Sequence, residues 1–355
     1  MKKSLLAFIL LLPFFASAHE GHGAAKSFPR PPEREISVEA QPWVQNCVAE
    51  PYLVADFIYW KVRQDGLQYA VKGIEDTGNP VTTKGKIYEP DFGGEPGFRV
   101  GLGLNLAHDG WDLLLKYTWL YASADDRISG GLTDDTIRPF WTHSLVGFLN
   151  GGVTRATSEW DLRMNVLDLE WGRNYYISRF LTLRPFFGFK GFWSKEDFNV
   201  RYRGLVLSQA GDNVVGSTLV HLNQDTWGFG IRFGTNTAWY FARNWSAYAD
   251  LALTAAWSRY DLDRRDRGVN HSTNGETLLM SIGYDRYTMT PIMELGVGLR
   301  WEMWFNDDSY HALIQAGWEE QIWWDFNRFF HIFQPNAMLG NLQFQGLTLK
   351  FRFDF

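Results

Sequence analysis

The sequence predicts an all-β protein, a transmembrane antiparallel up-and-down β-barrel of about 10–12 strands with short periplasmic turns and long extracellular loops. The first observation is composition: aromatic residues reach 17% of the 355-residue chain, charged residues only 21%, and glycines number 34. The second is that apolar and polar residues alternate with a period of two over long stretches. The third is that no apolar run after the N-terminus reaches the ~18 residues that a membrane helix needs.

Charge and cysteine content exclude several classes of protein. The formal net charge of −6 argues against nucleic acid as a partner. A chain with 1 cysteine cannot be a disulfide scaffold, and it has no Cys-x-x-Cys pair for structural zinc. With 45% hydrophobic residues, the chain is too apolar to be intrinsically disordered.

Residues 1–18 are expected to be a cleaved signal peptide. Lys2 and Lys3 form a positive N-terminal region, Leu5–Phe15 is apolar, and Ala16-Ser17-Ala18 supplies the small residues of a cleavage site. An anchor helix is the alternative, but the apolar run is too short to span a bilayer. We therefore expect an exported protein, located in the bacterial outer membrane.

Residues 19–50 are expected to form a flexible periplasmic tail, because prolines such as Pro31 and Pro32 disfavour helices and sheets. His19 and His22 are capable of binding a metal ion, yet the segment offers no further ligands and no preorganised site, so no metal site is predicted. Cys47 has no partner within the chain; an intermolecular disulfide and a free thiol both remain open.

The barrel is expected to occupy residues 51–355 and to begin with a strand from Tyr52 to about Val62, where Asp56 shares a face with apolar residues. Four hairpins follow, the first turning at Asp109-Gly110, and a last strand ends the chain. The hairpin strands are 98–106 with 111–121, 162–176 with 181–193, 226–240 with 245–258, and 290–304 with 310–319. These make ten strands. Extra pieces near 67–71, 198–202 and 277–289 could extend a neighbour or add a hairpin, so twelve strands stay open.

The segments between the hairpins are long and polar, and we expect them to be extracellular loops. They cover about 63–95, 123–160, 194–225, 259–287 and 320–341. Short turns on one side and long loops on the other are the asymmetry of outer-membrane barrels.

The C-terminal segment carries the most specific local signal. Leu347 to Phe355 alternates strictly, with Phe351, Phe353 and Phe355 on one face. Because no unpaired strand edge is stable in lipid, this segment is expected to close the barrel against the first strand. The three phenylalanines are therefore the predicted barrel-closure signal.

Several segments resemble a known family. Tyr52–Lys61 followed by Gly66–Ala70, then Gly172–Tyr176 with Leu181–Pro185, and finally Gly346–Phe355 are similar to the Legionella-type major outer membrane proteins, which have relatives in chlamydia-like bacteria. The resemblance covers roughly 50–355. It implies a pore-forming outer-membrane protein and brings no catalytic residues. Chlamydial major outer membrane proteins are cysteine-rich and cross-linked; with Cys47 alone, we expect no such network here.

Charged residues on the polar face of the strands are the candidate pore-lining groups. A basic residue facing lipid at the midplane would cost ~2–4 kcal/mol, so alternation assigns these side chains to the lumen. The candidates are Arg99, Lys116, Arg184, Lys190, Arg232, Asp250, Glu294, Arg300 and Glu302. Adding Lys350, Arg352, Asp112 and Asp168 gives eight basic against five acidic groups, which predicts a mild preference for anions. Inward glycines favour free space, whereas mixed signs favour pairing across a narrow interior.

The patterns in the sequence that resemble enzyme motifs have simpler explanations. Gly101-Leu102-Gly103 and Gly228-Phe229-Gly230 lie inside alternating strands, and His143-Ser144 has no third triad member. Asp261, Asp263 and Asp266 alternate with arginines, which favours salt bridges over calcium. We therefore expect no catalysis, no cofactor and no metal.

Two function hypotheses follow. The first is a porin-like channel for passive diffusion of small hydrophilic solutes or ions; the alternative is a non-conducting structural or adhesive barrel whose loops bind ligands. Expected partners are outer-membrane lipid and lipopolysaccharide, the barrel-assembly machinery and small solutes. A homo-oligomer remains open, and nucleic acid is not expected.

Overall fold

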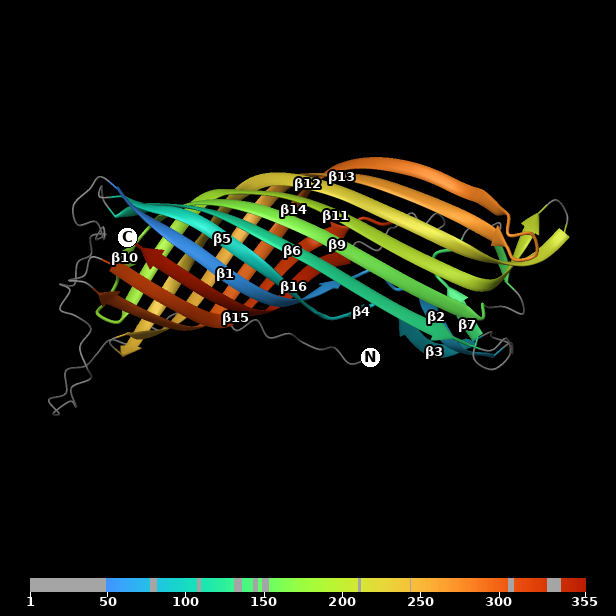
Figure 1. Cartoon of the computed structure of the whole chain (residues 1–355), viewed down its shortest axis with the longest axis horizontal. Coiled ribbons are helices and arrows are strands. Elements are labelled where there is room, and N and C mark those ends of the chain that lie inside the picture. The colour runs from blue at the N-terminus through green and yellow to red at the C-terminus, as the bar shows by residue number, and fades with distance from the viewer. Residues whose placement is uncertain are drawn as a thin grey trace.

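The fold is a closed antiparallel barrel of ten strands (Figure 1). A computed structural model describes residues 49–76, 82–106, 110–130, 136–142, 146–148, 153–209, 212–242, 244–305, 310–330 and 340–355. The barrel strands are β1 (Ala49–Gln64), β5 (Gly94–Leu106), β6 (Trp111–Ser129), β9 (Arg155–Arg173), β11 (Leu181–Gln209), β12 (Asp212–Ala242), β13 (Trp245–Asn270), β14 (Glu276–Phe305), β15 (Tyr310–Asn327) and β16 (Gly340–Asp354). Within the described ranges, no helix is long and apolar enough to cross a membrane. The predicted signal peptide, the tail with His19 and His22, and Cys47 lie outside the described residues.

The barrel closes between its first and last strands, as the C-terminal signal predicts. β16 runs antiparallel to β1 from the Tyr52–Asp354 pair to the Gln64–Leu342 pair. The other barrel strands pair with their sequence neighbours, so the topology is up-and-down. Phe351 and Phe355 point outward, where their rings are about half exposed.

The strands are much longer than the sequence pattern predicts. β11, β12 and β14 contain 29, 31 and 30 residues. The predicted loops at 194–225 and 259–287 are therefore wrong in large part, because strands continue through them. The predicted loop at 123–160 is wrong only at its ends, where β6 extends to Ser129 and β9 begins at Arg155. The extra pieces near 198–202 and 277–289 extend β11 and β14.

The reason for this error is that the side on which apolar residues lie reverses along strands such as β11 and β13. In β11, Phe189 and Trp193 point outward and Lys190 points inward; further on, Lys195 is exposed and Phe198 is buried. Apolar residues therefore face lipid in one half of the barrel and the interior in the other. Where the outer face meets water it is polar, and the sequence loses the apolar outer face by which a membrane strand is identified.

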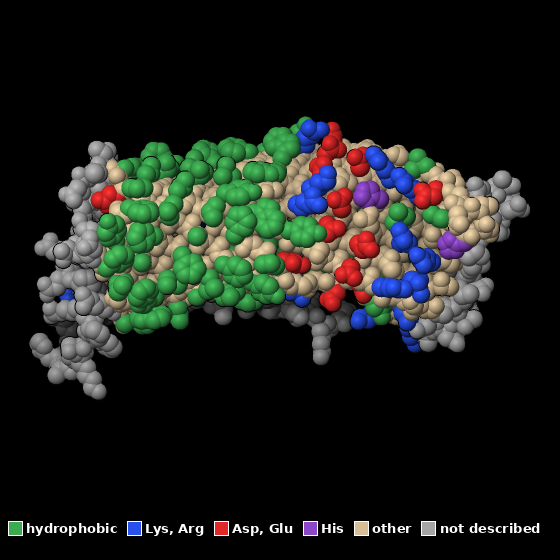
Figure 2. Space-filling model, in the orientation of Figure 1, with side chains coloured by type: hydrophobic (Ala, Val, Ile, Leu, Met, Phe, Trp, Pro, Cys, Tyr) green, Lys and Arg blue, Asp and Glu red, His purple; other side chains and the backbone are tan. Residues whose placement is uncertain are grey.

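The outer surface divides accordingly into two zones. Hydrophobic side chains cover the half that carries the short turns, and charged side chains cover the other half (Figure 2). The apolar half contains exposed Leu102, Phe229, Ile231, Trp257 and Val297, each more than half exposed. This belt is the lipid-facing surface of a transmembrane barrel, and the charged half extends beyond it.

Small strands complete the polar end without adding to the barrel wall. β2 (Ala70–Asp76), β3 (Thr82–Tyr88) and β7 (Thr136–Pro139) form a separate three-stranded sheet. The strand piece near 67–71 therefore belongs to this sheet, and the twelve-strand alternative is wrong. β4 (Asp91–Phe92), β8 (Val146–Phe148) and β10 (Tyr175–Tyr176) are short ribbons on β6 and β11.

Candidate functional site: the barrel interior

All nine predicted pore-lining residues lie on the inner face of the wall. Six belong to a charged layer inside the lipid-facing belt, whereas Asp250, Arg300 and Glu302 lie nearer the end with the short turns. The six are Arg99 on β5, Lys116 on β6, Arg184 and Lys190 on β11, Arg232 on β12 and Glu294 on β14. Their pore-lining role remains a prediction, since position alone does not establish a conducting path.

The centre of the charged layer is a cluster of two cations and two carboxylates. Arg232 lies 3.0 Å from Asp168 and 2.9 Å from Glu294. Lys190 Nζ lies 2.7 Å and 2.9 Å from the same two carboxylates. Each of the four residues is at most 8% exposed. Charges this deeply buried are tolerated because each contacts two of the opposite sign.

A second group continues this network toward β6 and β9. Glu170 contacts three cations: Lys116 at 2.6 Å, Arg184 at 3.3 Å and Arg232 at 3.5 Å. Arg184 also pairs with Asp112 and donates to the Asn236 side chain at 2.8 Å. The contact between Arg232 and Glu170 thus joins these two groups into one connected set of ion pairs.

The third group forms around Arg99. Its guanidinium is 3.0 Å from Asp56 and 2.9 Å from Glu319, and it lies 5.6 Å from the ring centre of Trp60. Asp56 and Glu319 come from β1 and β15, so this one cation joins three strands.

Sequence reasoning missed several of these acidic partners. Asp56, Glu170, Glu319 and Asp354 also face the interior and pair with basic groups there, so the five acidic groups assigned from the sequence are too few. The predicted anion preference therefore loses its basis. Glu170 was detectable, since it lies two residues after Asp168 on the same face of β9. Glu319 is harder to assign, because it is the last residue of the predicted strand 310–319 and the predicted loop 320–341 follows it directly.

The inward glycines do not create free space, so that expectation was wrong. A Cβ at Gly103 would lie 2.0 Å from the Tyr52 ring, and one at Gly317 would lie 2.1 Å from Tyr248 Oη. A Cβ at Gly228 would meet the Phe192 ring at 2.5 Å. Large side chains from facing strands therefore occupy the room that these glycines leave, as expected where two groups approach closely.

An apolar core fills the interior beyond the charged layer. Phe192 packs edge-on against Trp323 at 4.8 Å between ring centres, and Trp323 contacts Phe326 at 5.5 Å. Trp60 and Phe344 extend the cluster across β1 and β16. Trp323 and Phe326 are fully buried. Close-packed aromatic rings therefore occupy this part of the interior.

A buried ion pair holds two backbone segments in place inside the polar end of the barrel. Arg264 pairs with Asp266 at 2.9 Å and donates to the carbonyl oxygens of Trp141 and Phe330. Because Asp266 faces inward while Asp261 is exposed, these carboxylates do not converge on one calcium ion. The described residues contain no group of three or more His, Cys, Asp or Glu arranged to hold a metal. His143 and Ser144 lie outside the described residues.

The end with the short turns opens into a small polar vestibule of about 130 Å³. His311 Nδ1 lies 2.8 Å from Asp354, and its Nε2 lies 3.8 Å from Glu302. Arg300 also lines this cavity and donates to Gln315.

Comparisons with solved structures find outer-membrane barrels. The crystal structure of the outer membrane protease OmpT from Escherichia coli matches with 9% identity over 86% of this chain and 96% of that one, at a TM-score of 0.38. A Pseudomonas aeruginosa FadL homologue gives 8% identity, 86% and 90% coverage and a TM-score of 0.26. The TodX monoaromatic hydrocarbon channel (deltaS2S3 mutant) gives 8% identity, 90% and 96% coverage and a TM-score of 0.24. At these scores, the likenesses carry no functional argument.

A search of curated proteins returned no match. The sequence profile described as Legionella pneumophila major outer membrane protein precursor matches residues 47–355. That range contains every strand of the barrel. The chain therefore belongs to the Legionella major outer membrane protein family.

Proposed function

We propose that this protein is a sealed outer-membrane barrel, closed to passive diffusion in the conformation described, whose polar half serves as a structural and adhesive surface. The observation that carries the proposal is the filled lumen. A network of paired charges is followed by an apolar core in which Trp323 and Phe326 are fully buried. An ion crossing this core would lose its hydration without gaining polar partners.

The long strands support a role outside the membrane. Beyond the apolar belt, the barrel wall continues as a charged, water-facing surface (Figure 2). Since its interior is packed with apolar side chains, this half is rigid in the manner of a soluble β-protein core. A rigid platform of this kind holds surface groups in fixed positions for binding.

A porin-like channel is the second candidate, and the vestibule is the observation that favours it. The polar cavity around His311 and the charged layer would supply a hydrophilic path through about half of the barrel. Conduction would then require the aromatic core around Trp323 to move aside.

Planar-bilayer recordings distinguish the two candidates. We expect wild-type protein to insert without ion-sized current steps, and the variant W323A/F326A to produce them, because truncation opens the apolar core. The matched control is F229A/F233A, which removes two aromatic rings from the lipid-facing surface. Stable current steps from folded wild-type protein would refute the sealed barrel and support the channel.

A further inference from the structure

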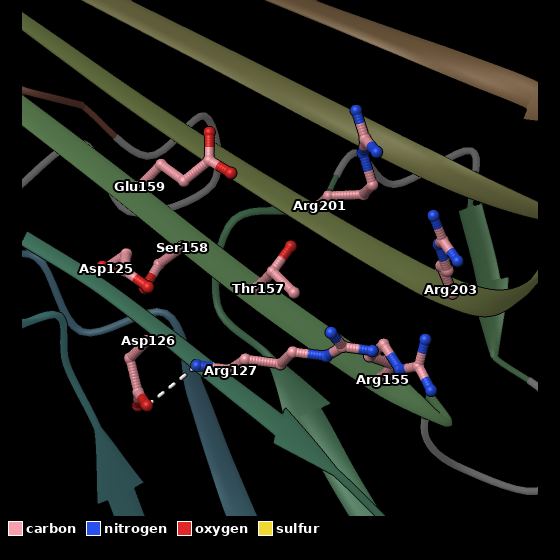
Figure 3. A pocket seen from close by; sticks show the side chains of 9 residues that line it. All are labelled: Asp125, Asp126, Arg127, Arg155, Thr157, Ser158, Glu159, Arg201 and Arg203. Carbon is pink, nitrogen blue, oxygen red and sulfur yellow. Dashed lines mark hydrogen bonds between the residues drawn. The ribbon is translucent and has the colours of Figure 1, made fainter.

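The outer wall of the barrel carries a pocket of about 320 Å³ beyond the apolar belt, where β6, β9 and β11 lie side by side (Figure 3). Four arginines line it: Arg127, Arg155, Arg201 and Arg203. We call these residues the four-arginine patch. They alternate with buried residues along their strands, which places all four on the outer face.

Strand register fixes the spacing of the patch. Thr157 on β9 pairs with Arg127 on one side and with Arg201 on the other. Arg155 pairs directly with Arg203. With neighbouring strands ~4.8 Å apart, the Cα atoms of Arg127 and Arg201 are separated by ~10 Å, and the second pair of arginines follows ~7 Å further along the strands. Four cations therefore share a compact area on a rigid sheet.

The four guanidinium groups are not held in ion pairs with any described residue, although Asp125, Asp126 and Glu159 line the same pocket. Among the described residues, none of the four guanidinium groups has an ion pair or a side-chain hydrogen bond. Other arginines on the outer wall do pair: Arg63 lies 3.3 Å from Glu89, and Arg259 lies 3.1 Å from Asp285. The acidic residues of the pocket lie at one end, and the arginines extend toward the other (Figure 3).

The patch lies well beyond the apolar belt. Trp193 is the last exposed aromatic residue of the belt on β11, and Arg201 follows eight residues later. At ~3.3 Å per residue and a tilt of ~40°, the patch lies about 20 Å beyond the belt. The headgroup layer of a phospholipid bilayer is only ~5–8 Å thick. The patch is therefore above that layer, where a dissolved anionic polymer can reach it.

We propose that the four-arginine patch binds a sulfated polysaccharide. Guanidinium groups present planar forks that match the oxygens of a sulfate or phosphate group, and several forks on one surface suit a polymer that carries repeated anionic groups. The hydroxyl of Thr157 adds a donor between the strands. No aromatic residue lines the pocket, so it lacks the stacking surface that single-stranded nucleic acids use.

The test is heparin binding by the full-length protein folded in nanodiscs. The variant R127S/R155S/R201S/R203S removes the patch. The matched control R259S/R265S/R267S/R286S removes four arginines from β13 and β14 and changes the net charge equally. Heat-modifiable gel mobility verifies that both variants are folded. We expect the patch variant to lose at least about tenfold in heparin affinity and to show a weaker salt dependence, while the control stays within about twofold of wild type.

Equal loss in both variants, or loss in neither, would overturn the proposal. So would a patch variant that loses binding to lipopolysaccharide vesicles or to a single-stranded oligonucleotide while its heparin affinity is unchanged. Neutral dextran should not bind. The proposal rests on the adhesive role proposed above, and the two fail separately. Wild-type protein that conducts ions yet binds heparin through the patch would refute the sealed barrel alone, whereas a silent barrel without heparin binding would refute the glycan site alone.

Discussion

Replacing Arg232 by alanine tests whether the charged layer holds the barrel together. The side chain is 4% exposed, and its guanidinium contacts Asp168 and Glu294 at 3.0 Å and 2.9 Å. Removing one partner of a buried ion pair costs ~3–5 kcal/mol, because the remaining charge is left buried without compensation. Lys190 still contacts both carboxylates in the variant. We therefore expect the lower end of that range, a loss of about 3 kcal/mol in the free energy of unfolding.

The assay is urea unfolding in lipid vesicles, followed by tryptophan fluorescence. R63A is the control, since Arg63 forms an exposed pair with Glu89 that is worth ~0.2–1 kcal/mol. The double variant R232A/E294Q removes one of the stranded charges and should recover part of the loss, which a double-mutant cycle measures. If R232A unfolds within about 1 kcal/mol of wild type, or no more readily than R63A, the layer is not a stabilising network.

Three further perturbations test the closure, the packing and the buried acid. Deleting Leu347–Phe355 leaves two open sheet edges in lipid and should abolish assembly, seen as loss of heat-modifiable gel mobility; a truncated protein that still migrates as a folded barrel would contradict this. G317A places a Cβ 2.1 Å from Tyr248 and should cost ~1–3 kcal/mol in urea unfolding, whereas G93A, where a Cβ meets nothing within 4 Å, should cost less than ~0.5 kcal/mol. Burial raises the pKa of Glu196, which lies beyond the belt, to about 8, so the folded state holds this proton more tightly than the unfolded state. Stability should be greatest below pH ~4.5 with respect to this group and should fall as the pH rises toward about 8. E196Q should remove that fall and stabilise the protein at pH 8–9; an unchanged pH profile would show that Glu196 is not buried as described.

Prediction from sequence succeeded where the strand crosses lipid, because there its outer face is apolar and its inner face is polar. The predicted strands 98–106 and 111–121 correspond to β5 and β6, and closure through Leu347 to Phe355 corresponds to β16. Both segments carry apolar residues on the outer face, which alternation reveals directly. Counting such segments predicts ten strands and leaves twelve open; the structure has ten.

Prediction failed in two situations. One is the part of a strand beyond the lipid, where the outer face becomes polar, and the other is an ion pair between residues far apart in the sequence. Residues 194–225 read as a loop because Lys195 and Asp197 stand where apolar residues stood before, although Phe198 and Val200 continue the strand on its inner face. Alternation assigned Arg99 to the lumen but could not find Glu319, which lies 220 positions away along the chain. Whether the lumen is open depends on such pairs, so the sequence pattern left that question undecided.

The reversal of alternation between Trp193 and Phe198 also determines how deep the barrel lies in the membrane. A strand whose outer face is apolar over its whole length can shift along the bilayer normal without exposing a polar side chain to hydrocarbon. Here a shift of two residues, ~5 Å along the normal, would either draw Lys195 into hydrocarbon or lift Trp193 out of it. The same transition occurs on β13 between Trp257 and Arg259, so two strands fix the position of the same membrane surface against the wall. Where the bilayer does not match this position, the lipid adapts, since the packed barrel does not deform easily.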